Sequence, residues 1–377
     1  MRVLLLADRS LASREHAMLR RLEIGLVDEG LRVIRCVPER SMPEESTGLE
    51  ACVEYTDSRW RLDAWRPEKP ILRRLAAVDS IAASDNEPDI GVIHAWGEAC
   101  WPLALSLALE LGADLALEVW SRQSLARVAW AESHAGRLAA LGASGLWLAP
   151  DDAMRTALAR STRRWPVRTS DWGVHMPADP VVRAADAPIE TVCILASGRD
   201  PLATINMLSG LARACAGRQP PMIFLDDAAP AAAPAIYRHA DALGLLPRLT
   251  LTAALESRRQ LVLQADAFVY PDCFGEHHSL VLEFMAAGLV PILRADRLVS
   301  VASDADIAAL VQEPSELGWE SAFRSVFEDP ARARRLAAAA QAHIRTSRLA
   351  HRQIASTVAA YNAAVAGRPM PLAAARR

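Results

Sequence analysis

The stretch "ADAFVYPDCFGEHHSLVLEFMAAGLVPI", from Ala265 to Ile292, decides the fold. It opens with the apolar run "AFVY", which has the length and composition of a buried strand. The polar segment "PDCFGEHH" follows, and in "SLVLEFMAA" the residues Leu280, Phe284 and Ala287 fall on one helical face. The run "LVPI" then returns to strand-like composition. The stretch therefore predicts a strand, a loop, a helix that packs on a sheet, and a second strand.

The ends of the predicted helix carry suitable capping residues. Ser279 is a favoured N-cap, and Gly288 is suited to the left-handed position that follows a helix. Glu283 then lies about one turn into the helix, beside the face that packs on the sheet. Its carboxylate would repel a phosphate but offers two acceptor oxygens to a neutral diol. Glu276 precedes the helix, in a loop that can lean toward a bound ligand.

The pair His277 and His278 beside Glu276 raises the alternative of a metal site. Structural zinc requires about four convergent ligands, and no further ligand stands near at the spacing of a metal-binding motif. Adjacent histidines also point in different directions, so the two rarely reach one ion. We therefore expect no metal here.

Outside this stretch, strands and helices alternate in two successive series. The first begins with "RVLLLA" (2–7), an amphipathic helix at about 13–29 and the strand "LRVIRCV". The second begins with "ETVCILASG" (190–198) and a helix at about 202–216. Strands that are apolar on both faces and alternate with helices indicate parallel sheets covered on both sides. We predict an α/β protein with two facing Rossmann-like domains, whose cleft is the default binding site.

The predicted boundaries follow the change of pattern. Gly173, Pro177 and Pro180 mark a segment of little periodicity between the two series. The predicted parts are an N-terminal domain at 1–173, a linker at 174–188, a C-terminal domain at 189–348, a final helix at about 349–366 and a flexible tail at 367–377.

Composition and charge exclude several classes of protein. A net charge of −3 indicates neither nucleic acid binding nor a strongly basic protein surface that binds membranes, and no nucleic-acid motif is present. The longest apolar stretch, at 100–120, is broken by acidic residues and reads as a helix followed by a strand, not as a membrane span. The six cysteines form no CxxC pair, and the chain begins with a strand-like run and no signal core. We expect a cytoplasmic protein.

The motifs, taken in order, resemble glycosyltransferase family 4, the group 1 transferases of the GT-B fold. The opening stretch resembles the most diagnostic block of the family. The segments "IHAWG" (93–97), "DWGVHMP" (171–177) and "LASGRD" (195–200) resemble its His-containing strand end, its interdomain segment and the strand end that opens its second domain. The resemblance covers nearly the whole chain. It implies retaining, metal-independent transfer of a sugar from a nucleotide-diphosphate sugar, without a further cofactor. It also implies that the final helix packs back onto the first domain.

The resemblance assigns roles to particular residues. Arg199 would clamp the diphosphate, Glu283 would accept the ribose hydroxyls, and the backbone amides around Ser279 and Leu280 would face phosphate. His94 would lie across the cleft near the transferred sugar. Arginine suits the first role because its planar guanidinium binds phosphate in a bidentate way, and Lys69 is the only lysine of the chain.

Each of these residues also has a structural interpretation. Arg199 can be a surface arginine, His94 can be a core histidine packed by Trp96, Glu283 can cap its own helix turn, and Glu276 can be solvated. Neither histidine interpretation is excluded by the sequence.

The chain departs from the family pattern at several positions. The family's glycine pair after the first strand is replaced by Ala12 and Ser13, and no lysine follows Arg199 in "DPLATIN". The residue eight positions before Glu283 is Gly275, not glutamate. These departures favour an alternative function, a catalytically inactive GT-B module that binds a nucleotide-sugar, a glycan or a protein partner.

The expected partners are a nucleotide-sugar donor and a glycan or lipid-linked acceptor. The acceptor would contact the loops at about 39–65, whose sequence does not indicate which acceptor binds. The cluster "ARSTRRWPVR" (159–168) holds four arginines. It reads either as a solvated face or as a contact with an anionic membrane or acceptor, which would place the protein peripherally at the inner membrane face.

Overall fold

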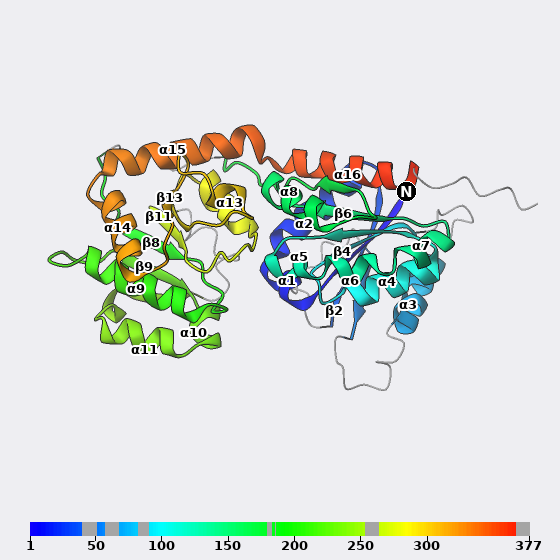
Figure 1. Ribbon diagram of the computed structural model, residues 1–377, viewed down its shortest axis with the longest axis horizontal. Coiled ribbons are helices and arrows are strands. Elements are labelled where there is room, and N and C mark those ends of the chain that lie inside the picture. The colour runs from blue at the N-terminus through cyan, green and yellow to red at the C-terminus, as the bar shows by residue number, and fades with distance from the viewer. Residues whose placement is uncertain are drawn as a thin grey trace, which may run out of the picture. The chain divides into compact units, whose positions relative to one another are not determined.

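The computed structural model describes residues 1–39, 51–56, 68–81, 90–178, 183–184, 186–252 and 264–366. The chain forms two compact units, one from Met1–Asp171 with the segment that begins at Ala350, and one from Trp172–Leu349. Each unit has its own parallel sheet (Figure 1). The prediction of two Rossmann-like domains is confirmed. The predicted tail at 367–377, most of the acceptor loops at 39–65 and part of the linker at 174–188 lie outside the described residues.

Unit 1 is built on a seven-stranded sheet with the order β3-β2-β1-β4-β5-β6-β7. All neighbouring strands are parallel. The strands are β1 (Arg2–Ala7), β2 (Arg32–Pro38), β3 (Ala51–Tyr55), β4 (Ile90–Trp96), β5 (Asp114–Glu118), β6 (Gly145–Ala149) and β7 (Val167–Thr169). The central strands are buried over their whole length, as expected for a parallel sheet covered on both faces.

The helices of unit 1 connect successive strands. They are α1 (Arg9–Arg14), α2 (His16–Asp28), α3 (Glu68–Ile81), α4 (Trp101–Leu111), α5 (Arg122–Ala126), α6 (Val128–Glu132), α7 (Ala135–Ala140) and α8 (Asp152–Ser161). The single helix predicted at about 13–29 is therefore two, because Glu15 interrupts the helical backbone at φ −117°. The amphipathic character predicted for this segment is confirmed, since Met18, Leu22 and Leu26 form a buried stripe on α2.

The C-terminal helix α16 (Ala350–Ala366) belongs to unit 1, as the resemblance implied. It packs on α2, where the side chain of Ile354 occupies the space beside Gly25. A Cβ atom at position 25 would come within 2.1 Å of the Ile354 side chain, which would have to move to make room for it. Tyr361 of α16 is fully buried against the sheet.

Unit 2 is built on a six-stranded parallel sheet with the order β10-β9-β8-β11-β12-β13. Its strands are β8 (Thr191–Ile194), β9 (Met222–Asp226), β10 (Leu249–Thr252), β11 (Ala267–Tyr270), β12 (Val290–Arg294) and β13 (Ala309–Val311). Its α-helices are α9 (Pro201–Ala214), α10 (Ala228–Ala232), α11 (Ala235–Ala242), α13 (Ser279–Ala286), α14 (Glu316–Phe327) and α15 (Pro330–Ser347), and its short 3-10 helices are η2 (Leu246–Arg248) and η4 (Ser300–Ala302).

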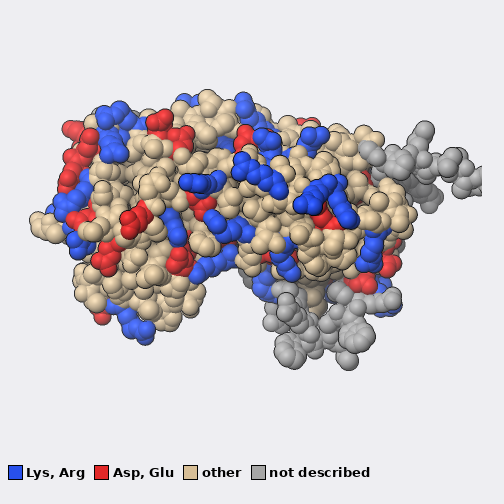
Figure 2. Space-filling model, in the orientation of Figure 1, with Lys and Arg blue, Asp and Glu red and all other residues tan. Residues whose placement is uncertain are grey.

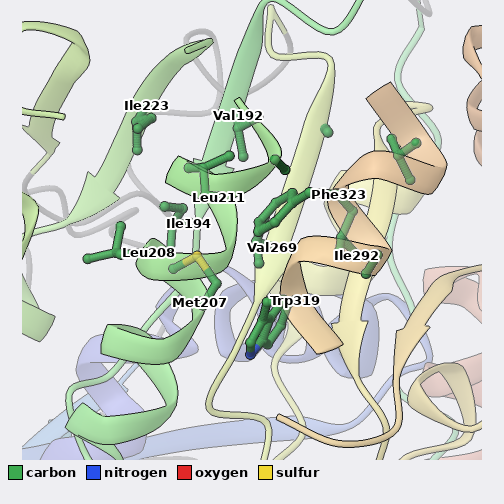
Figure 3. Packing of buried hydrophobic residues seen from close by; sticks show 14 of the residues in the cluster. Val192, Ile194, Met207, Leu208, Leu211, Ile223, Val269, Ile292, Trp319 and Phe323 are labelled. Carbon is green, nitrogen blue, oxygen red and sulfur yellow. The ribbon is translucent and has the colours of Figure 1, made fainter. Parts of the chain in front are cut away.

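The core of unit 2 lies where α9 and α14 meet over the sheet (Figure 3). Trp319 and Phe323 of α14 are fully buried, together with Met207 and Leu211 of α9. The two helices approach closely at Gly210, where a Cβ atom would lie 2.4 Å from that of Trp319. The glycine thus lets the backbones of the two helices come into direct contact, because backbone atoms of Glu316 and Glu320 also lie 2.8 Å from the same position.

Basic and acidic side chains are interspersed over the face of the molecule in Figure 2. Among the described residues, no helix is both long and apolar enough to cross a membrane.

The apolar stretch at 100–120 forms a helix and a strand, as predicted. These two elements are α4 and β5.

Candidate functional site

The candidate site lies at the carboxyl end of the unit 2 sheet, where the strand order reverses. β8 and β11 are neighbours, but the chain leaves β8 toward β9 and leaves β11 toward β12. The loops after β8 and β11 therefore diverge, and such a point is where open α/β sheets bind ligands. Asp272, after β11, ties the two loops together. Its Oδ2 atom accepts hydrogen bonds from the backbone N and from Oγ of Ser197, at 2.8 and 2.7 Å.

Arg199 and Glu276 meet across this point. Arg199 Nη1 donates to Glu276 Oε1 at 2.9 Å, with 46% of the arginine side chain exposed and only 5% of the glutamate side chain. The Tyr270 hydroxyl donates to the backbone oxygen of Glu276 at 3.2 Å. Two residues that the sequence analysis placed in separate loops thus form one ion pair, with the cation at the surface and the carboxylate beneath it.

The backbone before Glu276 forms a tight turn with positive φ at both central residues. Phe274 has φ +37° and Gly275 has φ +73°. The Glu276 amide donates to the Cys273 carbonyl at 2.7 Å, which closes the turn. Such turns prefer glycine, asparagine or aspartate at both positions. A phenylalanine here is strained, and 54% of its surface is exposed.

The Cys273 thiol lies under the turn and is fully buried. Burial raises its pKa well above the usual value. The thiolate is the reactive form of cysteine, so Cys273 is a packing residue here, not a nucleophile.

Arg294, which the sequence analysis missed, also belongs to this edge. It is the last residue of β12, next to β11, and its Nη1 donates to Asp200 Oδ2 at 2.9 Å. Its guanidinium carbon lies 5.5 Å from the centre of the Phe274 ring. The available signal was an arginine that ends the buried run "PILR", at the edge where doubly wound sheets bind anions.

The start of α13 differs from the expectation. The prediction that Ser279 is the N-cap is wrong, because His278 holds that position and its Nδ1 accepts a hydrogen bond from the Leu280 amide at 3.3 Å. Ser279 and Leu280 are both buried in the first turn. The backbone of residue 278 is extended, with φ −140° and ψ 124°, as is usual for an N-cap residue. Glu283 lies half-buried one turn further on.

The end of α13 is as predicted. Gly288 has φ +77°. Its amide donates to Met285 O, and the Leu289 amide donates to Phe284 O, at 3.0 and 3.1 Å. This pair of bonds is the Schellman motif, which a glycine at C′ favours. The predicted packing face is also buried, and the rings of Phe284 and Phe268 are 5.0 Å apart.

His94 lies in unit 1, in a buried polar network. Its Nδ1 is 2.6 Å from the Tyr361 hydroxyl, and its Nε2 is 3.2 Å from Glu118 Oε2. Ser170 Oγ donates to the other oxygen of Glu118 at 2.5 Å. The side chains of His94 and Glu118 have no exposed surface. His94 also contacts Trp96, with ring centres 4.6 Å apart. It occupies the core position that the sequence analysis gave as its alternative.

The equivalent reversal point in unit 1 lies between β1 and β4. Asp8 follows β1, caps α1 by accepting from the Leu11 amide at 2.9 Å, and accepts from the Ala99 amide at 3.3 Å. Gly97 has φ +93°, and a Cβ atom there would come within 2.1 Å of the Asp8 carboxylate. Ala12 and Ser13, which replace the family's glycine pair, lie inside α1.

The remaining candidates from the sequence, His277 and the 159–168 segment, have their own surroundings. His277 packs its ring against Trp172, with centres 6.2 Å apart. The described residues contain no group of three or more His, Cys, Asp or Glu side chains arranged to hold a metal ion. The four arginines of the 159–168 segment, Arg160, Arg163, Arg164 and Arg168, are all exposed.

A buried carboxylate holds part of this basic segment in place. Glu132 accepts hydrogen bonds from the backbone amides of Arg163, Arg164 and Trp165, at 3.0–3.2 Å, and from the Thr162 hydroxyl. Desolvation works against its charge, but these hydrogen bonds outweigh that effect and lower the pKa of Glu132 to about 2. The turn therefore presents Arg163 and Arg164 on a fixed backbone.

Comparison with known proteins identifies the fold. No protein-family model matches the sequence, and no curated protein matches it. Among solved structures, sucrose-phosphate synthase from Thermosynechococcus elongatus is similar over 97% of this chain and 99% of its own, with a TM-score of 0.73 and 14% identity. A glycosyltransferase from Rickettsia africae covers the same shares, with a TM-score of 0.70 and 10% identity. HepE from Anabaena, solved with UDP-glucose, covers 95% and 99%, with a TM-score of 0.67 and 15% identity. The fold is that of the GT-B glycosyltransferases.

Proposed function

We propose that this protein is a glycosyltransferase that moves a sugar from a nucleotide-diphosphate sugar to an acceptor. The observation that carries the proposal is the Arg199–Glu276 pair at the point where the strand order of the unit 2 sheet reverses. An exposed guanidinium there suits a phosphate, and the carboxylate beneath it suits a developing positive charge. The GT-B fold and the UDP complexes of HepE support a nucleotide-sugar donor.

The proposed roles follow the chemistry of each group. Arg199 stabilises the leaving diphosphate, and Glu276 stabilises the positive charge that forms on the transferred sugar. Glu283 accepts hydrogen bonds from the ribose hydroxyls, which need acceptor oxygens. The amides of Ser279 and Leu280, in the first turn of α13, approach phosphate once the His278 ring turns away from the Leu280 amide.

We propose that transfer is retaining and needs neither a metal ion nor another cofactor. The family resemblance supports the stereochemical course. Arginine and the amides of a helix N-terminus supply positive charge of the kind that neutralises a diphosphate in the absence of an ion. We propose a structural role for His94, whose hydrogen bond to Tyr361 joins α16 to the unit 1 sheet and whose hydrogen bond to Glu118 lies within that sheet.

The acceptor is proposed to be a glycan or a lipid-linked sugar. The exposed arginines at 160, 163, 164 and 168 suit an anionic headgroup at a membrane surface. The six cysteines, all of which the structure describes outside disulfides, suit a reducing, cytoplasmic compartment.

One observation favours a second candidate, the inactive binding module. The groups proposed to bind phosphate are engaged with protein atoms, Arg199 with Glu276 and the Leu280 amide with His278. The two candidates differ in a single measurement. The enzyme transfers or slowly hydrolyses the sugar of its donor, whereas the module binds the donor and releases it unchanged.

Replacing Arg199 by alanine should weaken binding of the nucleotide-sugar by about 1.5–3 kcal/mol, the usual size of a hydrogen bond to a charged group. The loss of affinity should be larger for the diphosphate sugar than for the free nucleoside, because the nucleoside has no phosphate that Arg199 could contact. Calorimetric titration of both ligands measures the difference.

Arg213→Ala is the matched control. Arg213 is also paired with a glutamate, Glu320, at 2.6 Å, and 52% of its side chain is exposed. It lies in the last turn of α9, about 20 Å of helix away from Arg199. This variant should bind the donor like the parent. Equal losses for nucleoside and diphosphate sugar in Arg199→Ala would mean that Arg199 only supports the fold.

A further inference from the structure

We propose that Arg294 is a second anion-binding residue of the site and contacts the diphosphate together with Arg199. This inference rests on the proposed function. The chain has no lysine in the segment after Arg199, and a diphosphate has two phosphate groups to neutralise. Arg294 brings a second guanidinium to the same edge of the sheet from a different strand.

Two short chain segments connect Arg294 to the Arg199–Glu276 pair. Asp200, which binds Arg294, directly follows Arg199 in the sequence. Phe274, which lies under the Arg294 guanidinium, is two residues before Glu276. The contacts therefore close a ring that runs from Arg199 to Glu276, Phe274, Arg294 and Asp200. The two arginines therefore belong to one connected group of side chains, and we infer that one ligand can contact both.

The two arginines differ in how readily they can exchange a carboxylate for a phosphate. The side chain of Glu276 is 5% exposed, so removing Arg199 from it would leave a buried charge without its partner. Asp200 is 34% exposed, and water can replace Arg294 there at low cost. The Asp200 carboxylate also keeps its second bond, in which Oδ1 accepts from the Ala203 amide and caps α9 at 3.1 Å. A ligand can thus recruit Arg294 away from Asp200, whereas Arg199, whose side chain is 46% exposed, contacts the ligand without leaving Glu276.

The strained turn gives Phe274 a part in this arrangement. A bulky residue at φ +37° carries a conformational cost that an exposed contact between a cation and an aromatic ring does not offset. Stability alone therefore favours glycine or asparagine at this position. The ring lies 5.5 Å from the guanidinium carbon, within the reach of a cation–π contact, and can hold the guanidinium at this edge of the sheet. We assign Phe274 as a positioning residue for Arg294.

The test is calorimetric titration with UDP, GDP, ADP, inorganic pyrophosphate and the three nucleosides. Arg294→Met should weaken binding of the preferred nucleoside diphosphate and of pyrophosphate by about 10- to 100-fold, and leave the nucleoside unchanged. Arg294→Lys keeps the charge but loses the fork, and should recover part of the affinity. Asparagine tolerates a positive φ, so Phe274→Asn should keep the turn. It should weaken binding of the diphosphate by roughly threefold. Arg213→Met removes a paired arginine elsewhere in unit 2 and should have no effect.

The outcomes separate the inference from the proposed function. If the parent binds a diphosphate and Arg294→Met binds it equally well, the inference is overturned while the proposed function stands. If Arg294→Met weakens nucleoside and diphosphate alike, Arg294 is structural and the inference is also overturned. If the parent binds no nucleoside diphosphate, both fail. A selective loss of diphosphate and pyrophosphate, partly restored by lysine, supports the inference.

Discussion

Glu276→Gln should lower the rate of sugar transfer by on the order of 10²-fold while nucleotide affinity stays close to that of the parent. The Glu276 carboxylate is held beneath the surface by Arg199 and is 5% exposed. A negative charge in such a place acts strongly on positive charge that develops on the sugar, because little water screens it. Glutamine keeps an acceptor oxygen for Arg199 but removes the charge. Binding should therefore survive while transfer does not.

The measurement is initial-rate kinetics of transfer, or of slow donor hydrolysis, beside a binding titration of the same variant. Glu320→Gln is the control, since Glu320 also pairs with an arginine but lies on α14. It should match the parent in both assays. If Glu276→Gln transfers sugar at the parental rate, Glu276 is structural and its proposed catalytic role is wrong.

Trp319→Ala should reduce the free energy of unfolding of unit 2 by about 3–5 kcal/mol. Trp319 is fully buried where α14 packs on α9 (Figure 3). Its Cβ atom lies against Gly210 of α9. Truncation leaves a cavity between two helices that cannot close further, because their backbones already touch at the glycine. Urea unfolding measures the loss, and amide hydrogen exchange shows where protection falls.

The control lies on the same helix. Leu317 is 65% exposed, so Leu317→Ala should change stability by less than about 0.5 kcal/mol. Protection should fall in α9, α14 and β8 of the Trp319 variant. A loss below about 1 kcal/mol would mean that the α9–α14 contact relaxes around the missing ring, contrary to the packing described above.

The fold could be predicted because it depends on patterns that the sequence displays directly. Buried parallel strands are continuous apolar runs, and Gly288 adopts the left-handed conformation that ends α13. Two features were missed for local reasons. Strand β3 lies in a segment that reads as a loop, and α1 is separated from α2 by a single residue, Glu15, that has no breaker signal.

The site was harder to predict because its contacts join residues far apart in the sequence. Glu276 lies 77 positions from Arg199, and Arg294 lies 94 positions from Asp200. No spacing rule reports such pairs. The N-cap was predicted from residue preference, which favours serine, but the backbone gives that place to His278. His94 shows the same limit, since a histidine at a strand end carries no sign of the tyrosine 267 residues later that binds it.

The most direct test of the proposed function is a calorimetric titration of the unmodified protein with UDP-, GDP- and ADP-glucose, each in the presence of excess EDTA. We expect saturable binding of at least one donor, and we expect the donor to bind more tightly than its nucleoside. The chelator should leave this affinity unchanged, because arginines and helix amides neutralise the charge of the diphosphate. Failure of all three donors to bind, or binding that vanishes with EDTA and returns with a divalent ion, would contradict the proposed function.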